Sequence, residues 1–214
     1  MQATATQRTA EWFAARVGCL TASRAAAAIN RTKAGKPTAD YAKMIDEILT
    51  ERITGEPADH FETPAMRWGT EHEDEAREEY ELATGEFVQQ TGFVPHPSIE
   101  YLGASPDGLV GEDGLVEIKC PSSLTHIQRV RAGVVPDEYK PQMMVQLLCT
   151  GRKWVDFVDY DPRLPAPYAS KRLFVVRFEP TAEELDDARA KCEDFLENVD
   201  QAMKFFKSEP ETQA

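Results

Sequence analysis

Two carboxylates and a lysine lie close together in the segment SPDGLVGEDGLVEIKCP, which runs from Ser105 to Pro121. Glu117 and Lys119 occupy alternate positions of an apolar run, so on a strand they share one face while Ile118 points into the core. If 107–110 pairs with 115–119 through the GEDG turn, Asp107 reaches the same end of the sheet. Two such carboxylates, with the carbonyl oxygen of Ile118, are ligands that Mg²⁺ prefers.

This arrangement could hydrolyse a phosphodiester. A divalent cation polarises a phosphoryl oxygen, and a lysine beside it can orient the attacking water and stabilise negative charge. The alternative is a solvated hairpin on which Lys119 is the ion-pair partner of Asp107 and Glu117. The proline turn before Asp107 and the cost of burying unneeded charge on an apolar strand favour the metal site. The turn acids Glu112 and Asp113 are expected to be surface decoration.

Length and composition predict one globular domain. The chain has 214 residues, of which 42% are hydrophobic and 29% are charged, and it lacks both a signal-peptide pattern and an apolar run of about 20 residues. We expect a single domain over residues 1–207 and a flexible polar tail over 208–214. Four scattered cysteines without CxxC spacing predict free thiols in a reducing cytoplasm.

The net charge of −13 argues at first against a nucleic-acid partner. The acidic residues are concentrated in 61–120 and 176–214, however, and the other regions are mildly basic. This distribution is compatible with a basic groove beside an acidic metal site.

Hydrophobic periodicity, together with the capping, glycine and proline residues that mark helix ends and turns, predicts the elements that must position these side chains. Thr21 is expected to cap a helix over 22–30, and Thr63 and Pro64 to begin a helix that ends at Gly85. Helices are expected at 12–16, 22–30, 38–53, 64–84, 122–132, 137–149 and 181–206, and strands at 86–94, 101–105, 107–110, 114–120, 153–160 and 172–178. The order predicts an α/β (α+β) fold with a central mixed β-sheet flanked by helices.

Several segments together resemble the PD-(D/E)xK nucleases of the lambda-exonuclease type, also called the YqaJ family of viral recombinases. The resemblance implies a restriction-endonuclease-like core. The matching segments are EWFAARVGCLTAS, AMRWGTEHEDEAREEYELATG, GASPDGL, LVEIKCP, YKPQMMVQLLCTG and VDYDPR, in the family's order from Glu11 to about Arg163.

The resemblance implies roles for individual residues. Asp107 and Glu117 would bind metal with the Ile118 carbonyl, Lys119 would position the attacking water, and Glu73 would be a further metal or water ligand. A run of neighbouring acids means that periodicity alone cannot select Glu73.

Arg16 and Ser23 would hold the 5′-phosphate of DNA, with Ser105 and Thr21 close by. The alternative is that Thr21 is only a helix cap and Arg16 only a surface residue.

Other correspondences are less direct. Gln142 matches the family's glutamine helix and is a candidate DNA-binding residue. Met144 stands where many members have a second glutamine, so Gln146 is a candidate substitute. The alternative is that Gln142 and Gln146 form only a polar stripe on an amphipathic helix. Met66 takes the place of an apolar residue that wedges into the duplex end, although helical methionines are more often core.

The remaining polar candidates are the basic residues of one loop and the four histidines. Lys33, with Arg31 and Lys36, could contact the duplex backbone or simply be solvated. The histidines show no metal spacing and receive no role; His72 is expected to be a satisfied core histidine. They are His60, His72, His96 and His126.

The activity implied is a Mg²⁺-dependent 5′–3′ exonuclease, with Mn²⁺ able to substitute. It would degrade one strand of linear double-stranded DNA and leave 3′ overhangs for phage-type recombination. Family members form homotrimer rings and work with a single-strand annealing protein in the cytoplasm of bacterial or phage-infected cells. The alternatives are a non-catalytic DNA-end-binding protein and an endonuclease of the same superfamily, which would need no 5′-phosphate pocket.

Overall fold

The computed structural model describes residues 5–57 and 63–207. Its helices are α1 (Ala10–Arg16), α2 (Ala25–Ile29), α3 (Ala39–Thr54), α4 (Pro64–Thr84), α5 (Ser123–Ala132), α6 (Lys140–Thr150) and α7 (Ala182–Lys207). Its strands are β1 (Leu20–Thr21), β2 (Val88–Gln89), β3 (Val94–Pro95), β4 (Leu102–Ala104), β5 (Gly108–Val110), β6 (Gly114–Lys119), β7 (Trp154–Tyr160) and β8 (Leu173–Phe178). Short 3₁₀ turns are η1 (Ala22–Arg24), η2 (Asp137–Tyr139) and η3 (Ala166–Lys171).

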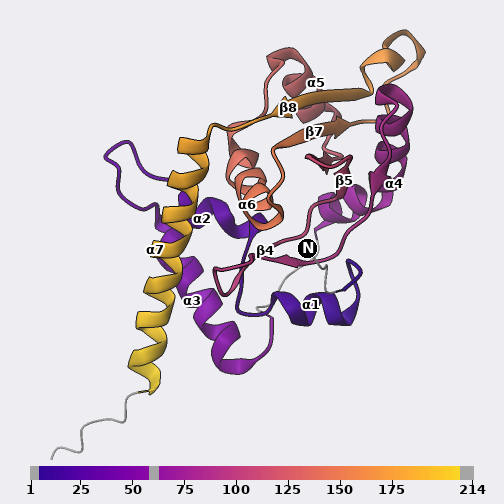
Figure 1. Ribbon diagram of the computed structural model, residues 1–214. Coiled ribbons are helices and arrows are strands. Elements are labelled where there is room, and N and C mark those ends of the chain that lie inside the picture. Colours follow the sequence, from indigo (N-terminus) through magenta and orange to yellow (C-terminus); the bar gives the residue numbers. More distant parts are fainter. Residues whose placement is uncertain (1–4, 58–62, 208–214) are drawn as a thin grey trace, which may run out of the picture.

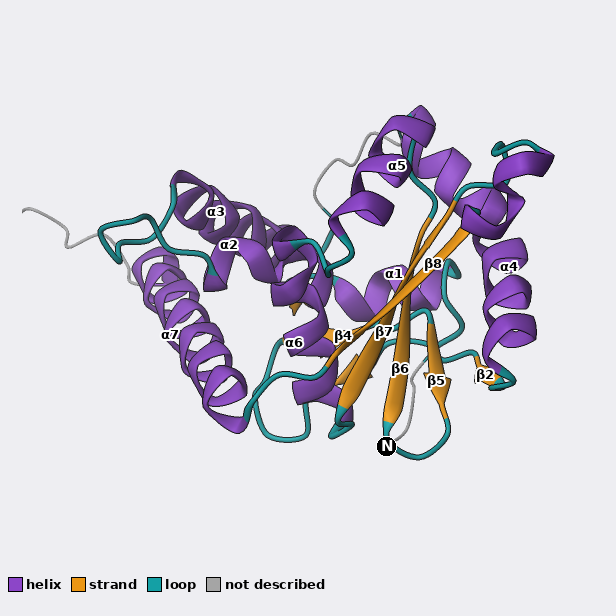
Figure 2. Cartoon of the chain, turned by 90° about the horizontal axis from the view of Figure 1, so that it is seen from above, coloured by secondary structure: helices purple, strands orange, loops and turns teal. Residues whose placement is uncertain are grey.

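A five-stranded mixed sheet forms the centre of the molecule, in the order β2-β5-β6-β7-β8 (Figure 2). Strands β6 and β7 are parallel, and the other neighbours are antiparallel. The expected hairpin is present, with Gly108 opposite Val116. The prediction of a mixed sheet flanked by helices is confirmed. A second sheet, β1-β4-β3, was not predicted.

Helices cover both faces of the main sheet. On one face, Ala76 and Tyr80 of α4 pack against Val116 and Ile118 of β6. Because side chains alternate along a strand, Leu115, Glu117 and Lys119 face the other side. There Met143 and Leu147 of α6 pack in one core with Leu115. Helix α6 therefore covers the face that carries the candidate catalytic residues.

The far side of α6 joins the sheet to a group of helices. Val145 and Cys149 share a core with residues of α2, α3 and α7, which lie together at one side of the molecule (Figure 1). All four cysteines are buried free thiols. Burial raises the pKa of Cys120 and of Cys192 to about 12, and it also raises the pKa of Cys19 and Cys149. Within the described residues no helix is long and apolar enough to cross a membrane.

The boundaries of α4 follow the predicted signals. The Thr63 hydroxyl accepts a hydrogen bond from the Met66 backbone N–H at 3.2 Å, Pro64 is the first helical residue, and Gly85 ends the helix with a positive φ of 74°. Glycine adopts this left-handed conformation without the strain that a Cβ would bring.

The prediction of one strand over 86–94 is wrong. Its first part, β2, pairs with β5 in the main sheet, whereas β3 pairs with β4 in the small sheet. Between them the Thr91 carbonyl accepts a hydrogen bond from the Gln7 side chain at 3.0 Å. The chain therefore passes from one sheet to the other against the N-terminal segment.

The prediction of Thr21 as a helix cap is also wrong. Thr21 belongs to β1, opposite Gly103, and the 3₁₀ turn η1 separates it from α2. Its hydroxyl makes no capping bond and lies 3.2 Å from the Ser23 hydroxyl. Thr21 therefore precedes η1 in the N-cap position, but its hydroxyl is directed to Ser23 and caps no backbone N–H.

Candidate active site

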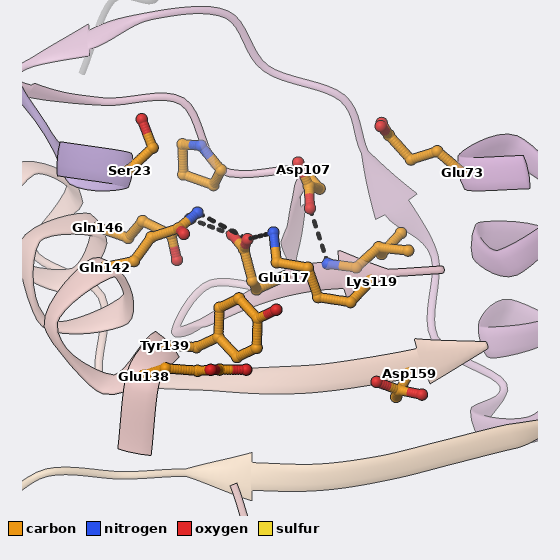
Figure 3. Close-up of polar contacts among 12 residues, drawn as sticks. Ser23, Glu73, Asp107, Glu117, Lys119, Glu138, Tyr139, Gln142, Gln146 and Asp159 are labelled. Atoms are coloured by element: carbon orange, nitrogen blue, oxygen red, sulfur yellow. Dashed lines mark hydrogen bonds and ion pairs between the residues drawn. The ribbon is translucent and has the colours of Figure 1, made fainter. Parts of the chain in front are cut away.

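Asp107, Glu117 and Lys119 lie at the end of the β5–β6 hairpin (Figure 3). The Lys119 ammonium donates a hydrogen bond to Oε1 of Glu117, its neighbour on the same strand face. Oδ2 of Asp107 accepts a hydrogen bond from the Ile118 backbone N–H at 2.7 Å. That bond fixes the Asp107 carboxylate against the strand that carries the other two residues.

Two glutamines of α6 hold the Glu117 carboxylate. Gln142 Nε2 donates to Oε1 at 2.6 Å, and Gln146 Nε2 donates to Oε2 at 2.5 Å. Glu117 is only 1% exposed, and Gln146 is fully buried. The expectation that both glutamines share a helix face is confirmed, and Figure 3 shows both pointing at Glu117. Gln146 thus supplies a second amide donor, although Met144 occupies the family's usual position.

Burial and repulsion shape the charges of this group. Burial, and then the nearby Glu117 carboxylate, raise the pKa of Asp107 well above its usual range. Burial alone would lower the pKa of Lys119, but Glu117 and Asp107 outweigh it and raise the pKa. Lys119 is therefore an ammonium at neutral pH, suited to orienting water and stabilising negative charge rather than to accepting a proton.

The donor set fits a hard divalent cation. Asp107 and Glu117 present carboxylate oxygens that repel each other, and a cation between them would relieve that repulsion. Among residues 5–57 and 63–207, no three His, Cys, Asp or Glu side chains gather into a complete metal site. Mg²⁺ does not require one, because it usually keeps several waters and takes only one or two carboxylates.

Glu73 faces the same cavity as Asp107. This cavity, of about 710 Å³, is also lined by Arg8, Arg77 and Gln90. The Glu73 carboxylate accepts hydrogen bonds from Arg8 at 2.5 Å and from Arg77 at 3.2 Å. Glu73 is thus close enough to Asp107 to raise its pKa, and it is held by two guanidinium groups.

The N-terminal segment brings Arg8 to this cavity. The Gln7 side chain donates to the carbonyls of Thr91 at 3.0 Å and Pro106 at 2.8 Å. Sequence reasoning did not select Arg8, because a short polar stretch before α1 carries no periodic signal. Its proximity to the recognisable W-x-x-x-R segment was the one available hint.

A second group surrounds the Arg16 guanidinium. Its Nη1 donates to the Ser105 hydroxyl at 3.2 Å, and its Nη2 donates to the Ser23 hydroxyl at 3.4 Å. Its Cζ atom lies over the Trp12 ring, 4.1 Å from the ring centroid. The Trp12 indole N–H also donates to Ser105, at 2.9 Å. Thr21 is buried behind Ser23, beside its hydroxyl.

The Arg16 group has the electrostatics of an anion site. Burial and the nearby Arg24 charge lower the pKa of Arg16 to about 10, so it stays charged at neutral pH. Its direct hydrogen-bond partners are hydroxyls and its stacking partner is an aromatic ring, and none of these carries a negative charge. Phosphate oxygens are suited to such a site because they accept several charge-assisted hydrogen bonds.

Other predicted residues lie outside these two groups. Met66 is 55% exposed in the first turn of α4, which excludes the alternative that it is a core residue. Lys33 and Lys36 are exposed in the loop after α2, whereas the Arg31 guanidinium is bonded to the Ala28 and Asn30 carbonyls.

Three histidines have local partners, and His60 lies outside the described residues. The His72 ring bonds to the Trp68 carbonyl and stacks on the Trp68 indole ring, so its polar group has a partner as expected. His72 is half-buried and not fully in the core. His96 accepts backbone N–H bonds, and His126 is buried against Asp159.

Comparisons with known proteins place the chain among viral recombinases and exonucleases of the same fold. The YqaJ-like viral recombinase domain matches residues 11–153. A search of curated proteins found no match. Among solved structures, an alkaline exonuclease (LHK-Exo) from Laribacter hongkongensis is 41% identical, with a TM-score of 0.85 over 93% of this chain and 96% of its own. The same enzyme in complex with dAMP is 40% identical over the same shares, also with a TM-score of 0.85. A phage related exonuclease from Haemophilus somnus 129PT, 16% identical with a TM-score of 0.65 over 88% of this chain and 96% of its own, shares the fold.

Proposed function

The chain belongs to the family of YqaJ-like viral recombinase domains, and from this premise we propose that it is a nuclease that hydrolyses DNA. The observation that carries the proposal is the group of Asp107, Glu117 and Lys119 on one hairpin. The similarity to an alkaline exonuclease supports exonuclease action, and that enzyme's complex with dAMP supports a nucleotide as the product.

The site residues have distinct roles in this proposal. Asp107, Glu117 and the Ile118 carbonyl would hold Mg²⁺ or Mn²⁺, with Glu73 as a further ligand directly or through water. The cation, when bound, polarises the phosphoryl group and neutralises its negative charge. Lys119 orients the attacking water and stabilises the charge that develops on the phosphate. Gln142 and Gln146 keep the Glu117 carboxylate in place.

The polarity of cleavage follows from the Arg16 group. Arg16, Ser23 and Ser105 would hold a terminal 5′-phosphate, with Thr21 supporting Ser23. Ser105 is two residues from Asp107, so a held 5′ end lies next to the cleavage site. The enzyme would therefore remove nucleotides from the 5′ end of linear duplex DNA and leave 3′ overhangs. Met66 would meet the duplex end, and Lys33 would contact its backbone.

The cellular role extends the same proposal. The 3′ overhangs would serve phage-type recombination with a single-strand annealing protein, in the cytoplasm of a bacterial or phage-infected cell. The enzyme would act as a homotrimer ring. In a ring, only the surface that meets DNA needs to be basic, so an acidic chain is compatible with DNA binding.

The nuclease proposal is tested on linear duplex DNA with Mg²⁺, labelled separately at the 5′ and 3′ ends. The wild-type protein is expected to release 5′ mononucleotides. Asp107→Ala and Lys119→Ala lower the rate by at least about 100-fold, because each removes a group that acts on the reacting phosphate. Glu112→Ala, which removes an exposed acid from the same hairpin, is the matched control and retains activity.

Three outcomes would contradict the proposal that the chain is an exonuclease. Efficient cutting of closed circles indicates an endonuclease, and DNA-end binding without hydrolysis indicates an end-binding protein. Undiminished activity in Lys119→Ala removes Lys119 from the chemistry.

The 5′-phosphate role is tested with Arg16→Ala. We expect it to erode the preference for phosphorylated over unphosphorylated 5′ ends by about 10-fold or more, since a charge-assisted bond to phosphate is lost. Arg189→Ala, a surface change on α7, is expected to keep the wild-type preference. Equal losses on both kinds of end would exclude Arg16 from end recognition.

A further inference from the structure

The Lys119 ammonium is placed by two groups. It ends a flexible four-carbon chain, so its position depends on what surrounds it. It donates to the Glu117 carboxylate, and its Nζ lies 5.2 Å from the centroid of the Tyr139 ring. An aromatic face attracts a cation within roughly 6 Å. Figure 3 shows the Tyr139 ring beneath the Glu117–Lys119 pair, with Asp107 on the other side in this view.

The Tyr139 ring is itself fixed in place. Its hydroxyl oxygen accepts a hydrogen bond from Arg129 Nη2 at 2.8 Å, and the Arg129 guanidinium lies 4.9 Å from the ring centroid. The Phe157 ring packs beside it with centroids 5.2 Å apart and planes tilted by 31°. These contacts restrict both the tilt and the sliding of the ring.

Arg129 is anchored in the interior. Its Nη1 donates to Oδ2 of Asp159 at 2.7 Å, and Oδ1 of Asp159 bonds to the His126 ring at 2.5 Å. Asp159 and His126 are fully buried, and Asp159 is the register partner of Lys119 on β7. A continuous chain of contacts therefore runs from a buried ion pair, through Arg129 and Tyr139, to the Lys119 ammonium.

We propose that Tyr139 is a positioning residue that holds the Lys119 ammonium through its ring face. It acts through Lys119, so the proposal rests on the role of Lys119 in the proposed nuclease. Tyr139 lies at the end of η2, three residues before Gln142. The segment at the start of α6 thus supports both Lys119 and Glu117.

The placement of Lys119 is tested by NMR without DNA. Lysine side chains are labelled with ¹³C at Cε, and the Lys119 signal is assigned by its loss in Lys119→Arg. Tyr139→Leu removes the ring current and is expected to shift this signal, whereas Tyr139→Phe keeps it near its wild-type position. The signal of Lys153, which pairs with Asp113 at the surface, is the internal control. An unmoved Lys119 signal in Tyr139→Leu overturns the proposal, whether or not the protein cuts DNA.

Kinetics test the consequence for hydrolysis. Tyr139→Leu is expected to lower kcat about 10- to 30-fold, the range for losing a desolvated cation–π contact, with a much smaller change in KM. Tyr139→Phe should restore kcat to within about threefold of wild type, because the ring remains. A wild-type protein that hydrolyses no DNA refutes the proposed function, and the NMR result then decides the positioning role alone.

A fluorinated ring separates packing from electrostatics, even if Tyr139→Leu fails to fold. Pentafluorophenylalanine introduced at position 139 fills nearly the same space as phenylalanine but reverses the charge distribution of the ring face. It is expected to lower kcat as much as leucine does. A kcat equal to that of Tyr139→Phe would show that the ring only fills space and would overturn the proposal.

Discussion

At the scale of single residues, two histidines bond in opposite ways. Both ring nitrogens of His126 face acceptor oxygens, Asp159 at 2.5 Å and the Lys171 carbonyl at 2.7 Å, and the protonated ring, which donates from both nitrogens, satisfies both. Burial alone would lower the pKa of His126, but these bonds outweigh it and raise the pKa. His96 instead accepts bonds from the backbone N–H groups of Ser98 and Ile99, and burial, with the nearby Arg189 charge, lowers its pKa.

These shifts predict opposite pH dependences of stability. The contribution of His126 is fully present below its unfolded pKa of about 6.5 and is lost as pH rises through the raised folded pKa. The contribution of His96 is present above about 6.5 and is lost as pH falls through its lowered folded pKa. Urea unfolding of wild type, His126→Asn and His96→Asn at pH values on both sides of about 6.5 measures how much unfolding free energy each histidine contributes at each pH. If the loss of unfolding free energy changed with pH in the same direction for both variants, the opposite bonding of the two rings would be contradicted.

At the scale of elements, the N-terminal segment is held by close packing against the turn between β2 and β3. A Cβ built on Gly92 would lie 1.6 Å from the Ala5 carbonyl oxygen, and backbone cannot move aside as a flexible side chain can. Gly92→Ala is therefore expected to displace the segment and break the Arg8–Glu73 ion pair. Faster trypsin cleavage after Arg8, with the rest of the chain intact, is the measurement.

Gly69→Ala is the matched control for this prediction, because an added Cβ at that helical position meets open space. It should leave cleavage after Arg8 at the wild-type rate. Equal cleavage rates in Gly92→Ala and wild type would mean that the segment does not depend on this packing.

Elements with local signals could be predicted from the sequence. Helix α4 carries its cap, its first-turn proline and its terminal glycine within itself, and the β5–β6 hairpin carries alternation and a turn. The division of 86–94 between two sheets could not be predicted, because the choice of partner strand is non-local.

The same distinction between local patterns and non-local contacts separates the site residues that could be predicted from those that could not. Family motifs selected Asp107, Glu117, Lys119 and Arg16. Arg8 lies outside these motifs, and its contact with Glu73 joins distant parts of the chain. Tyr139 opens the matching segment YKPQMMVQLLCTG, but the motif alone did not show that its ring faces Lys119.

At the scale of the whole molecule, α6 belongs to two cores. Met143 and Leu147 pack on the main sheet, and Val145 packs with α2, α3 and α7. We expect a single calorimetric transition whose van't Hoff and calorimetric enthalpies agree, as for one cooperative domain over 1–207. Leu147→Ala should lower the unfolding free energy by about 2–5 kcal/mol and keep one transition. Two resolved transitions would show that the sheet and the helical group unfold separately.

The burial of all four cysteines makes the chain suitable for thiol-selective dyes. Each native thiol is at most 8% exposed, and its raised pKa leaves little reactive thiolate at neutral pH. A cysteine introduced at Asp186, which is exposed on α7, would then be the preferred maleimide target without removing any native cysteine. Helix α7 packs mainly with α2, α3 and α6, and only its first turns, through Leu185, reach the core of the main sheet; in Figure 1 most of the helix lies to one side of that sheet. A fluorophore there could follow single molecules along DNA while the residues around Asp107 remain unmodified.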